Sequence, residues 1–268
     1  MKKNVLFISF VVSLGGFLFG FDAGIISGVM SYVGPEFNLN DIQTGWVVSS
    51  PSFAAMIAML VAGRLSDLIG RKKILIVVAF LYSFSAITSA FSFSYETLYL
   101  SRMIGGIAFG TALILAPTYI AEISNAENRG RLVSIQQLNI VLGFFAAFLS
   151  NYFFNEYNSS GSEFLNDNNV WRWMLGVEFI PAILYFFALY FVPKSPRWLY
   201  VRGFINESKS VLKKLHGKSK YLIELDSIKQ SVKSNVKSKK VPLKTLLKPS
   251  LRFIMIVGLT LGILQQIT

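Results

Sequence analysis

Residues 5–33 read VLFISFVVSLGGFLFGFDAGIISGVMSYV, and the only charged residue in this stretch is Asp22. A helix needs about 20 consecutive, mostly apolar residues to cross the hydrocarbon core of a membrane. The stretch is longer than the apolar region of a secretory signal peptide, lacks a small-residue cleavage site, and is followed by further apolar stretches. It therefore predicts a membrane-spanning helix rather than a signal peptide.

Five further stretches have the length and apolar character of membrane-spanning helices. They are residues 44–62, 74–95, 97–121, 132–155 and 173–193. A seventh, residues 253–268, is uncharged but ends before a crossing is complete. Over the whole chain 53% of residues are hydrophobic and 15% are charged, whereas soluble domains have about 25% charged residues. The sequence predicts an all-α integral membrane protein.

The basic residues are concentrated on one side of the predicted membrane. The net charge is +12, and residues 194–252 hold 16 Lys and Arg but only three acids. When the predicted spans alternate in direction, 24 of the 26 basic residues lie on one side and a single one, Arg172, lies on the other. Cytoplasmic loops are enriched in Lys and Arg. We therefore expect a multi-pass protein of the bacterial cell (inner) membrane with a cytoplasmic N-terminus, and no nucleic acid as a partner.

The order of the spans predicts three parts. Residues 1–193 form a six-helix transmembrane domain, residues 194–250 a basic cytoplasmic linker with short amphipathic helices, and residues 251–268 the truncated start of a seventh helix in a C-terminal domain. Many transporters consist of two six-helix halves, each built from two inverted three-helix repeats. We expect the N-terminal half of such a transporter, with the other half in cis. The Lys excess of the linker reflects either the cytoplasmic bias of basic residues or binding of membrane lipids with anionic headgroups.

The residue types that carry most enzyme chemistry are scarce. The chain has no cysteine and one histidine, His216, which argues against disulfides, zinc sites and hydrolytic triads. The sequence Gly217-Lys218-Ser219 imitates the end of a phosphate-binding loop, but Leu212 occupies the position of the required upstream glycine. We expect no enzymatic activity, no cofactor and no bound metal.

Three ionisable residues interrupt the apolar stretches: Asp22, Arg102 and Glu178. Burying such a group in a membrane costs roughly 2.5–3.5 kcal/mol even on a lenient scale, so each one predicts a functional role. Opposite charges in neighbouring spans usually pair, because an isolated buried charge is costly. The charges fit two interpretations equally well, an ion or substrate path and a structural salt bridge.

A glycine stripe runs along the first helix, because Gly16, Gly20, Gly24 and Gly28 recur every fourth residue. Small residues at this spacing let a neighbouring helix approach closely. Asp22 lies about 200° around the helix from Gly20. It is therefore predicted to point away from the stripe.

Glutamines supply polar groups suited to a neutral ligand. Gln137 shares a predicted helix face with Ile140, and Gln265 and Gln266 are adjacent near the end of the seventh apolar stretch. Carboxamides both donate and accept hydrogen bonds, which suits a polyhydroxylated ligand better than an ion. Each glutamine taken alone also fits a role as an interhelical hydrogen bonder.

Short motifs occur through the whole chain, at residues 15–22, 63–73, 102–110, 117–122, 129–131 and 193–199. Their sequences and their order are similar to those of the sugar porter family of the major facilitator superfamily. Within the family the chain most resembles the bacterial proton-coupled members, which have Asp, Arg and Glu at the positions of Asp22, Arg102 and Glu178. The resemblance implies a 12-helix fold and transport of a monosaccharide, a pentose or a hexose, by alternating access with proton symport.

The resemblance also implies roles for individual residues. For proton coupling it implies Asp22, Arg102 and Glu178. For sugar binding it implies Gln137, Gln265, Gln266, Phe19 and Ile140. For a cytoplasmic gate it implies Gly63, Arg64, Asp67, Gly70, Arg71, Glu122, Arg129 and Arg197, in which Asp67, Glu122 and Arg129 are expected to form a charge cluster.

The chain departs from the family pattern at three positions. Phe21 replaces a tyrosine of the first motif, Lys194 replaces an acid of the last motif, and Phe144 replaces a glutamine found in a xylose carrier. The sugar is therefore left open. A facilitative uniporter and a non-transporting sugar receptor on the same fold are the alternatives, and facilitative carriers usually have Asn where this chain has Asp22.

Overall fold

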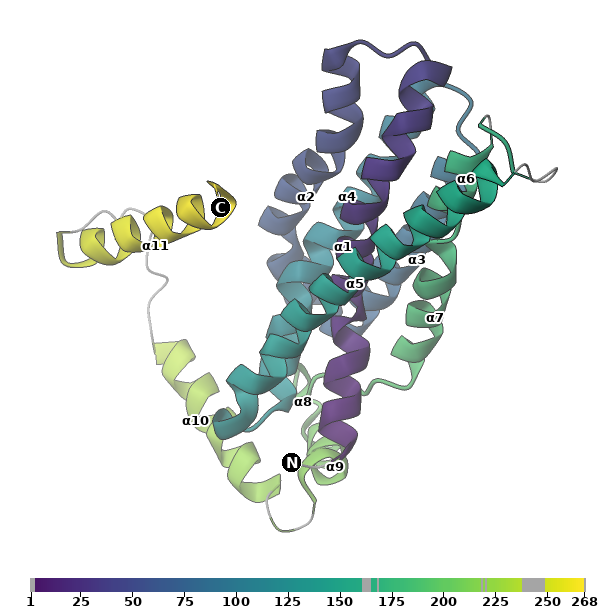
Figure 1. Ribbon diagram of the computed structural model, residues 1–268. Helices are drawn as coiled ribbons and strands as arrows, with labels where there is room; N and C mark the ends of the chain where they lie inside the picture. The colour runs from purple at the N-terminus through teal and green to yellow at the C-terminus, as the bar shows by residue number, and fades with distance from the viewer. Residues whose placement is uncertain are drawn as a thin grey trace. The chain divides into compact units, whose positions relative to one another are not determined.

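The computed structural model describes the backbone of residues 3–160, 165–167, 169–217, 219, 221–237 and 249–267. The chain forms two compact units, Met1–Glu224 and Leu225–Thr268. In the described part of the chain every regular element is a helix (Figure 1). The elements are α1 (Lys3–Glu36), α2 (Asp41–Ile69), α3 (Arg71–Ala90), α4 (Tyr95–Ile123), the 3-10 turn η1 (Ala126–Asn128), α5 (Arg129–Ser159), α6 (Val170–Gly176), α7 (Phe179–Tyr190), α8 (Pro196–Val201), α9 (Ile205–His216), α10 (Tyr221–Lys237) and α11 (Pro249–Ile267).

Six segments of the described chain are long and apolar enough to cross a membrane. They are α1, α2, α3, α4, α5 and the α6–α7 pair, which together cover Val170–Tyr190. They coincide with the six complete spans predicted from the sequence, so the all-α membrane fold is confirmed. The seventh apolar stretch lies in α11, within the second unit. The division into residues 1–193, 194–250 and 251–268 stays a prediction.

Glycines allow the closest helix contacts of the first unit. The predicted stripe on α1 packs against α5, which crosses it in Figure 1. A Cβ added at Gly20 would overlap the carbonyl oxygen of Ile140, and one added at Gly24 would lie 2.7 Å from the Cβ of Ala147. On α4, Gly106 lies in the same way against the backbone of Pro51 in α2. Larger side chains at these positions would separate the helices.

The sixth span is interrupted at Glu178, between α6 and α7. Pro181 has no N–H group to donate to the carbonyl of Val177, so the α-helical pattern cannot continue there. The N–H of Ile180 bonds the Val177 carbonyl instead, at 3.1 Å. The sequence predicts one continuous span from residue 173 to residue 193, whereas the structure has two shorter helices with an acid at their junction.

Two short helices pack beneath the transmembrane helices within the first unit. Leu199 in α8 and Val211 and Leu215 in α9 join the same buried apolar cluster as residues of α1, α3, α4 and α7. The exposed side of α9 is polar, and its last turn carries Lys213 and Lys214. α8 and α9 therefore contribute to the core of the first unit, and the linker with amphipathic helices expected over residues 194–250 stays a prediction.

Candidate functional site

Asp22 and Arg102 form an ion pair in the interior of the helix bundle. Arg102 in α4 donates from Nη1 to Oδ1 of Asp22 at 3.0 Å and from Nη2 to Oδ2 at 3.2 Å. Its Nε donates to the carbonyl oxygen of Val47 in α2 at 3.2 Å. The side chains are 2% exposed for Arg102 and 13% for Asp22. Two parallel bonds to one carboxylate fix both the distance and the orientation of the pair.

Glu178 completes a cluster of the three intramembrane charges. It lies at the α6–α7 junction, is 5% exposed, and is within electrostatic range of both Asp22 and Arg102. The fold therefore brings together all three residues predicted for proton coupling, from α1, from α4 and from the interrupted sixth span. With both acids ionised the cluster carries one net negative charge, and Asp22 is the acid that is hydrogen-bonded to Arg102.

The residues predicted to bind sugar lie on different helices of the first unit. Phe19 in α1 packs on Phe109 in α4, with ring centroids 4.8 Å apart. Ile140 in α5 contacts the glycine stripe of α1, whereas Gln137 is exposed. The neighbouring Gln136 is buried instead and lies against Gly16. Gln137 thus leaves its carboxamide free to meet a ligand or another part of the protein.

The remaining predicted sugar contacts, Gln265 and Gln266, lie in α11. Their side chains are outside the described residues. They belong to the second unit, and the fold of each unit is described by itself. Their part in a sugar site stays a prediction.

At the C-terminal ends of α2 and α4 and the N-terminal end of α3, Arg71 joins two of the predicted gate acids. Its Nη2 lies 2.5 Å from Oδ1 of Asp67 and 3.1 Å from Oε1 of Glu122. The hydroxyl of Ser195 donates to Glu122 at 2.6 Å, and Arg197 is within electrostatic range of this acid. Asp67 and Glu122 therefore share a cation, but this cation is Arg71 and not the expected Arg129.

The other predicted gate residues surround this cluster or lie outside it. Arg129, expected as the basic member, is exposed and takes part in no salt bridge within the described part of the chain. Arg64 is also exposed, and a Cβ at Gly63 would meet nothing within 4 Å. Gly70 has φ 104°, a conformation that favours glycine, and faces the ring of Trp198.

The sequence did not predict that α8 and the residue after it supply hydrogen bonds to the last carbonyls of α2. Trp198 donates from Nε1 to the carbonyl oxygen of Asp67 at 3.0 Å, and Arg202 donates to the carbonyls of Asp67 and Leu68. These carbonyls lie at the C-terminal end of α2, where no helical N–H is left to bond them. The motif at residues 193–199 was the available signal, but its partners in α2 are distant in sequence.

Arg172, the single basic residue predicted on the outer side, has a clear structural role. It donates from Nη2 to Glu36 at the end of α1 and from Nη1 to the carbonyls of Ala90 and Ser92 at the end of α3. The indole of Trp171 also donates to Glu36. These contacts join the C-terminal ends of α1 and α3 to the start of α6.

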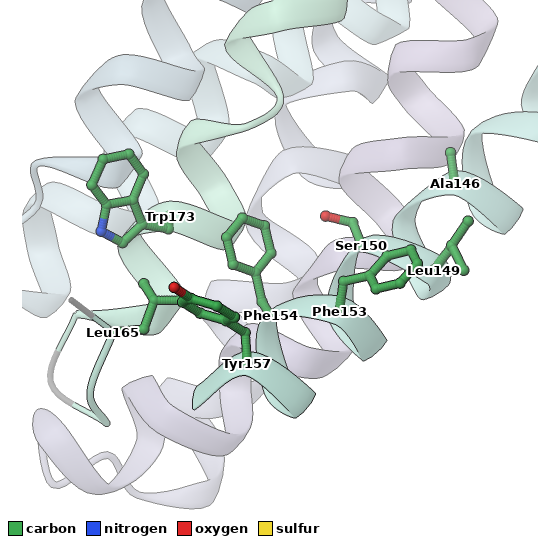
Figure 2. Close-up of a pocket in the computed structure, with 8 residues that line it drawn as sticks. All are labelled: Ala146, Leu149, Ser150, Phe153, Phe154, Tyr157, Leu165 and Trp173. Atoms are coloured by element: carbon green, nitrogen blue, oxygen red, sulfur yellow. The ribbon is translucent and has the colours of Figure 1, made fainter. Parts of the chain in front are cut away.

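A groove of about 640 Å³ lies along the C-terminal half of α5 (Figure 2). Figure 2 shows it lined by the rings of Phe153, Phe154 and Tyr157, with Ser150 as one of its few polar groups. Sugar sites need several hydrogen-bonding groups on an apolar frame. The groove is therefore a poor candidate for the sugar site.

Six membrane-length helices around a buried ion pair define a multi-pass membrane protein, the N-terminal half of the major facilitator fold. Residues 8–268 match the family described as "Sugar (and other) transporter", and the chain belongs to that family. The predicted resemblance to sugar porters is confirmed.

Three of the named relatives are sugar transporters. The chain is 35% identical to the D-xylose transporter of Levilactobacillus brevis over 268 residues, 99% of this chain and 56% of the relative. It is 35% identical to the arabinose-proton symporter of Bacillus subtilis over 263 residues, 98% of this chain and 55% of the relative. It is 36% identical to the galactose-proton symporter of Escherichia coli over 232 residues, 86% and 48% respectively.

Solved structures give the same fold. The proton:xylose symporter XylE bound to 6-bromo-6-deoxy-D-glucose matches with a TM-score of 0.81 and 32% identity, over 87% of this chain and 54% of that one. A partially occluded inward-open form of XylE from E. coli matches with a TM-score of 0.80 and 32% identity, over 86% and 60%. The chain spans about half the length of the relatives that it matches.

Proposed function

We propose that the protein carries a monosaccharide, a pentose or a hexose, across the cell membrane by alternating access, together with protons. Membership of the family and the names of the relatives, which include xylose, arabinose and galactose carriers, support the sugar. The single observation that carries proton coupling is the buried ion pair of Asp22 with Arg102, beside Glu178.

The ion pair has the chemistry that coupling requires. Arginine stays protonated in proteins, so the movable proton of the pair belongs to Asp22. A conformational change that separates the two side chains would favour protonation of the acid, and one that restores the pair would favour release. Proton binding would then be linked to the side on which the site is open, and a proton gradient could drive sugar uphill.

In this proposal three residues of the first unit contact the sugar. Gln137 supplies an exposed carboxamide from α5, and Phe19 and Ile140 supply apolar contacts for the sugar ring. A sugar-binding role for Gln265 and Gln266 in α11 stays a prediction. The Arg71 cluster with Asp67 and Glu122 acts as the inner gate, which holds the cytoplasmic side closed until its ion pairs break.

Alternating access needs two halves that move about a central site. We propose that these six helices act with a second six-helix half, in cis, because the relatives are about twice as long as this chain. Residues 1–268 by themselves are then expected to show no saturable sugar uptake unless they dimerise. In the membrane, the N-terminus and the basic segment after α7 lie on the cytoplasmic side, and the protein performs no catalysis.

The proposal is tested with the full-length protein encoded by the gene, reconstituted into liposomes. An imposed inward proton gradient should drive accumulation of labelled D-xylose, L-arabinose or D-galactose above the external concentration, and a protonophore should abolish it. Saturable equilibration without accumulation would indicate a uniporter. Sugar binding without any flux would indicate a receptor.

A further inference from the structure

Two tyrosines place their hydroxyls on the backbone of α1, close to the charge cluster. Tyr82 in α3 is 1% exposed, and its hydroxyl donates a hydrogen bond of 3.0 Å to the carbonyl oxygen of Gly15. Tyr185 in α7 is fully buried, and its hydroxyl makes a longer bond, 3.5 Å, to the carbonyl oxygen of Val12. Both hydroxyls therefore reach the same turn of α1.

Glycine at position 15 makes this approach possible. A Cβ there would lie 2.9 Å from the Cβ of Ala112 in α4 and 3.2 Å from the hydroxyl of Tyr185. Gly15 is not part of the stripe that faces α5. It instead brings the bare backbone of α1 against α3, α4 and α7.

The hydrogen bond from Tyr82 is not needed to satisfy the backbone carbonyl groups of α1. In a continuous α-helix the carbonyl of Gly15 already accepts the N–H of residue 19, so the phenol uses the second lone pair of that oxygen. A buried hydroxyl, in contrast, is costly unless it is bonded. Phenylalanine at position 82 would fill the same space without this requirement. The hydroxyl therefore does more than fill space: it ties α3 to one carbonyl of α1.

Fixing this carbonyl also fixes the direction in which Asp22 points. Asp22 follows Gly15 by seven residues, which is two helical turns, so the two positions lie within about 20° of each other around α1. Tyr82 is within electrostatic range of both Glu178 and Asp22. A small rotation of α1 at Gly15 would move the Asp22 carboxylate relative to Arg102, whose guanidinium is held in turn by Val47.

We propose that Tyr82 is a positioning residue of the coupling cluster, which holds α1 in the rotation that pairs Asp22 with Arg102. This inference rests on the proposed proton coupling. Tyr82 itself touches neither the sugar nor the transferred proton. Its loss is expected to loosen the link between protons and sugar rather than to stop sugar movement.

Tyr119 offers a matched control. It is also fully buried, and its hydroxyl donates to a backbone carbonyl, that of Pro193, at 2.6 Å. It lies near Glu122 at the inner end of α4, away from the Asp22 cluster. The variants Tyr82→Phe and Tyr119→Phe each remove one oxygen atom and one buried hydrogen bond, and both keep the aromatic ring. Both are expected to fold and to lose similar amounts of thermal stability.

The experiment uses the full-length protein encoded by the gene, reconstituted into liposomes, with labelled D-xylose as the substrate. It compares two transport activities. One is accumulation driven by a proton gradient, and the other is exchange of internal for external xylose without a gradient. Tyr82→Phe should lower accumulation about fivefold, the factor for one net hydrogen bond of about 1 kcal/mol, and leave exchange nearly unchanged. Tyr119→Phe should leave the ratio of the two activities unchanged.

Two results would overturn the role of Tyr82: an equal loss of accumulation and exchange, or a ratio that matches that of Tyr119→Phe. Asp22→Asn, measured in parallel, separates this failure from failure of the proposed function. If Asp22→Asn loses accumulation and Tyr82→Phe does not, only the inference about Tyr82 is wrong. If Asp22→Asn still accumulates xylose, coupling through Asp22 is wrong and the inference falls with it.

Discussion

Arg102 binds the carboxylate of Asp22 through two hydrogen bonds although 80 positions separate the two residues in the chain. Asp22 lies in α1 and Arg102 in α4, the first helices of the two three-helix repeats that the sequence predicts. The ion pair therefore joins the two repeats in the membrane interior. Because both side chains are nearly buried, solvent screens their attraction little, and a change in their separation would have a large electrostatic effect.

The glycine stripe of α1 predicts a sharp difference between two alanine substitutions in the same helix. Gly20→Ala should destabilise the protein by about 1–3 kcal/mol, the usual cost of overpacking, because the added methyl group would overlap the carbonyl of Ile140. Gly34→Ala meets nothing within 4 Å and should be neutral or slightly stabilising. The unfolding temperatures of the detergent-purified variants measure the difference. Equal unfolding temperatures would contradict the packing of α1 on α5.

The Arg71 cluster with Asp67 and Glu122 predicts that Arg71 contributes more to stability than Arg64 does. Arg71→Met leaves Glu122, whose side chain is 7% exposed, without its bridging cation. Breaking a buried pair costs about 3–5 kcal/mol, and the lower end applies here because Asp67 is 67% exposed and solvent screens that half of the bridge.

Arg64→Met is the control for this prediction, because Arg64 is exposed. Its unfolding temperature should stay close to that of the unmodified protein. If Arg64→Met and Arg71→Met lose the same stability, the cluster contributes no more than a solvated surface charge. A partial return of stability in Arg71→Lys would support the ionic character of the bridge.

We predict that replacement of Gln137 lowers the affinity for sugar without lowering the stability of the protein. Gln137→Ala should raise the half-saturating sugar concentration by about tenfold, since one or two hydrogen bonds of about 1 kcal/mol each are lost. Leu138→Ala is the control, because Leu138 is 58% exposed and offers no hydrogen-bonding group. The measurement is the dependence of sugar uptake on sugar concentration, made with the full-length protein encoded by the gene. Unchanged affinity in Gln137→Ala would remove this residue from the proposed sugar site.

The absence of cysteine allows a direct test of topology. Single cysteines at Ile42, which is 84% exposed near the start of α2, and at Glu127 in the turn before α5 introduce the only thiols within residues 1–268. A membrane-impermeant maleimide should label Ile42→Cys on intact cells and Glu127→Cys only after the membrane is permeabilised. The reverse pattern would contradict a cytoplasmic N-terminus.

The fold follows from the sequence where local rules apply. Apolar length predicts the six spans, and the fourfold glycine spacing predicts the close packing of α1 on a neighbour with Asp22 on another face. Helix starts are equally local, as in the reciprocal cap formed by Asn40 and Gln43. The break at Glu178 was missed, although Pro181 signals it, because the hydropathy of the sixth span is continuous.

The candidate site was predictable in its residue types but not in all its partners. Burial cost alone predicts that Arg102 pairs with an acid, either Asp22 or Glu178, because an isolated charge in a membrane is costly. In the predicted gate, by contrast, Arg71 and Arg129 carry the same charge, so charge does not tell which of them pairs with Glu122. The backbone turn at Gly70 lies directly before Arg71, which is the residue that reaches this acid. Tyr82 gave no signal at all, because a buried tyrosine and a buried phenylalanine look alike in an apolar stretch.

The central claim is that Asp22 couples protons to sugar. It is tested most directly by Asp22→Asn in the full-length protein encoded by the gene, reconstituted into liposomes. The change removes the titratable group and keeps the size of the side chain, and Asp41→Asn, at an exposed acid near the start of α2, is the control. The account predicts that Asp22→Asn abolishes proton-driven accumulation of sugar yet keeps sugar-for-sugar exchange, while Asp41→Asn keeps both. An Asp22→Asn variant that still concentrates sugar against its gradient would contradict it.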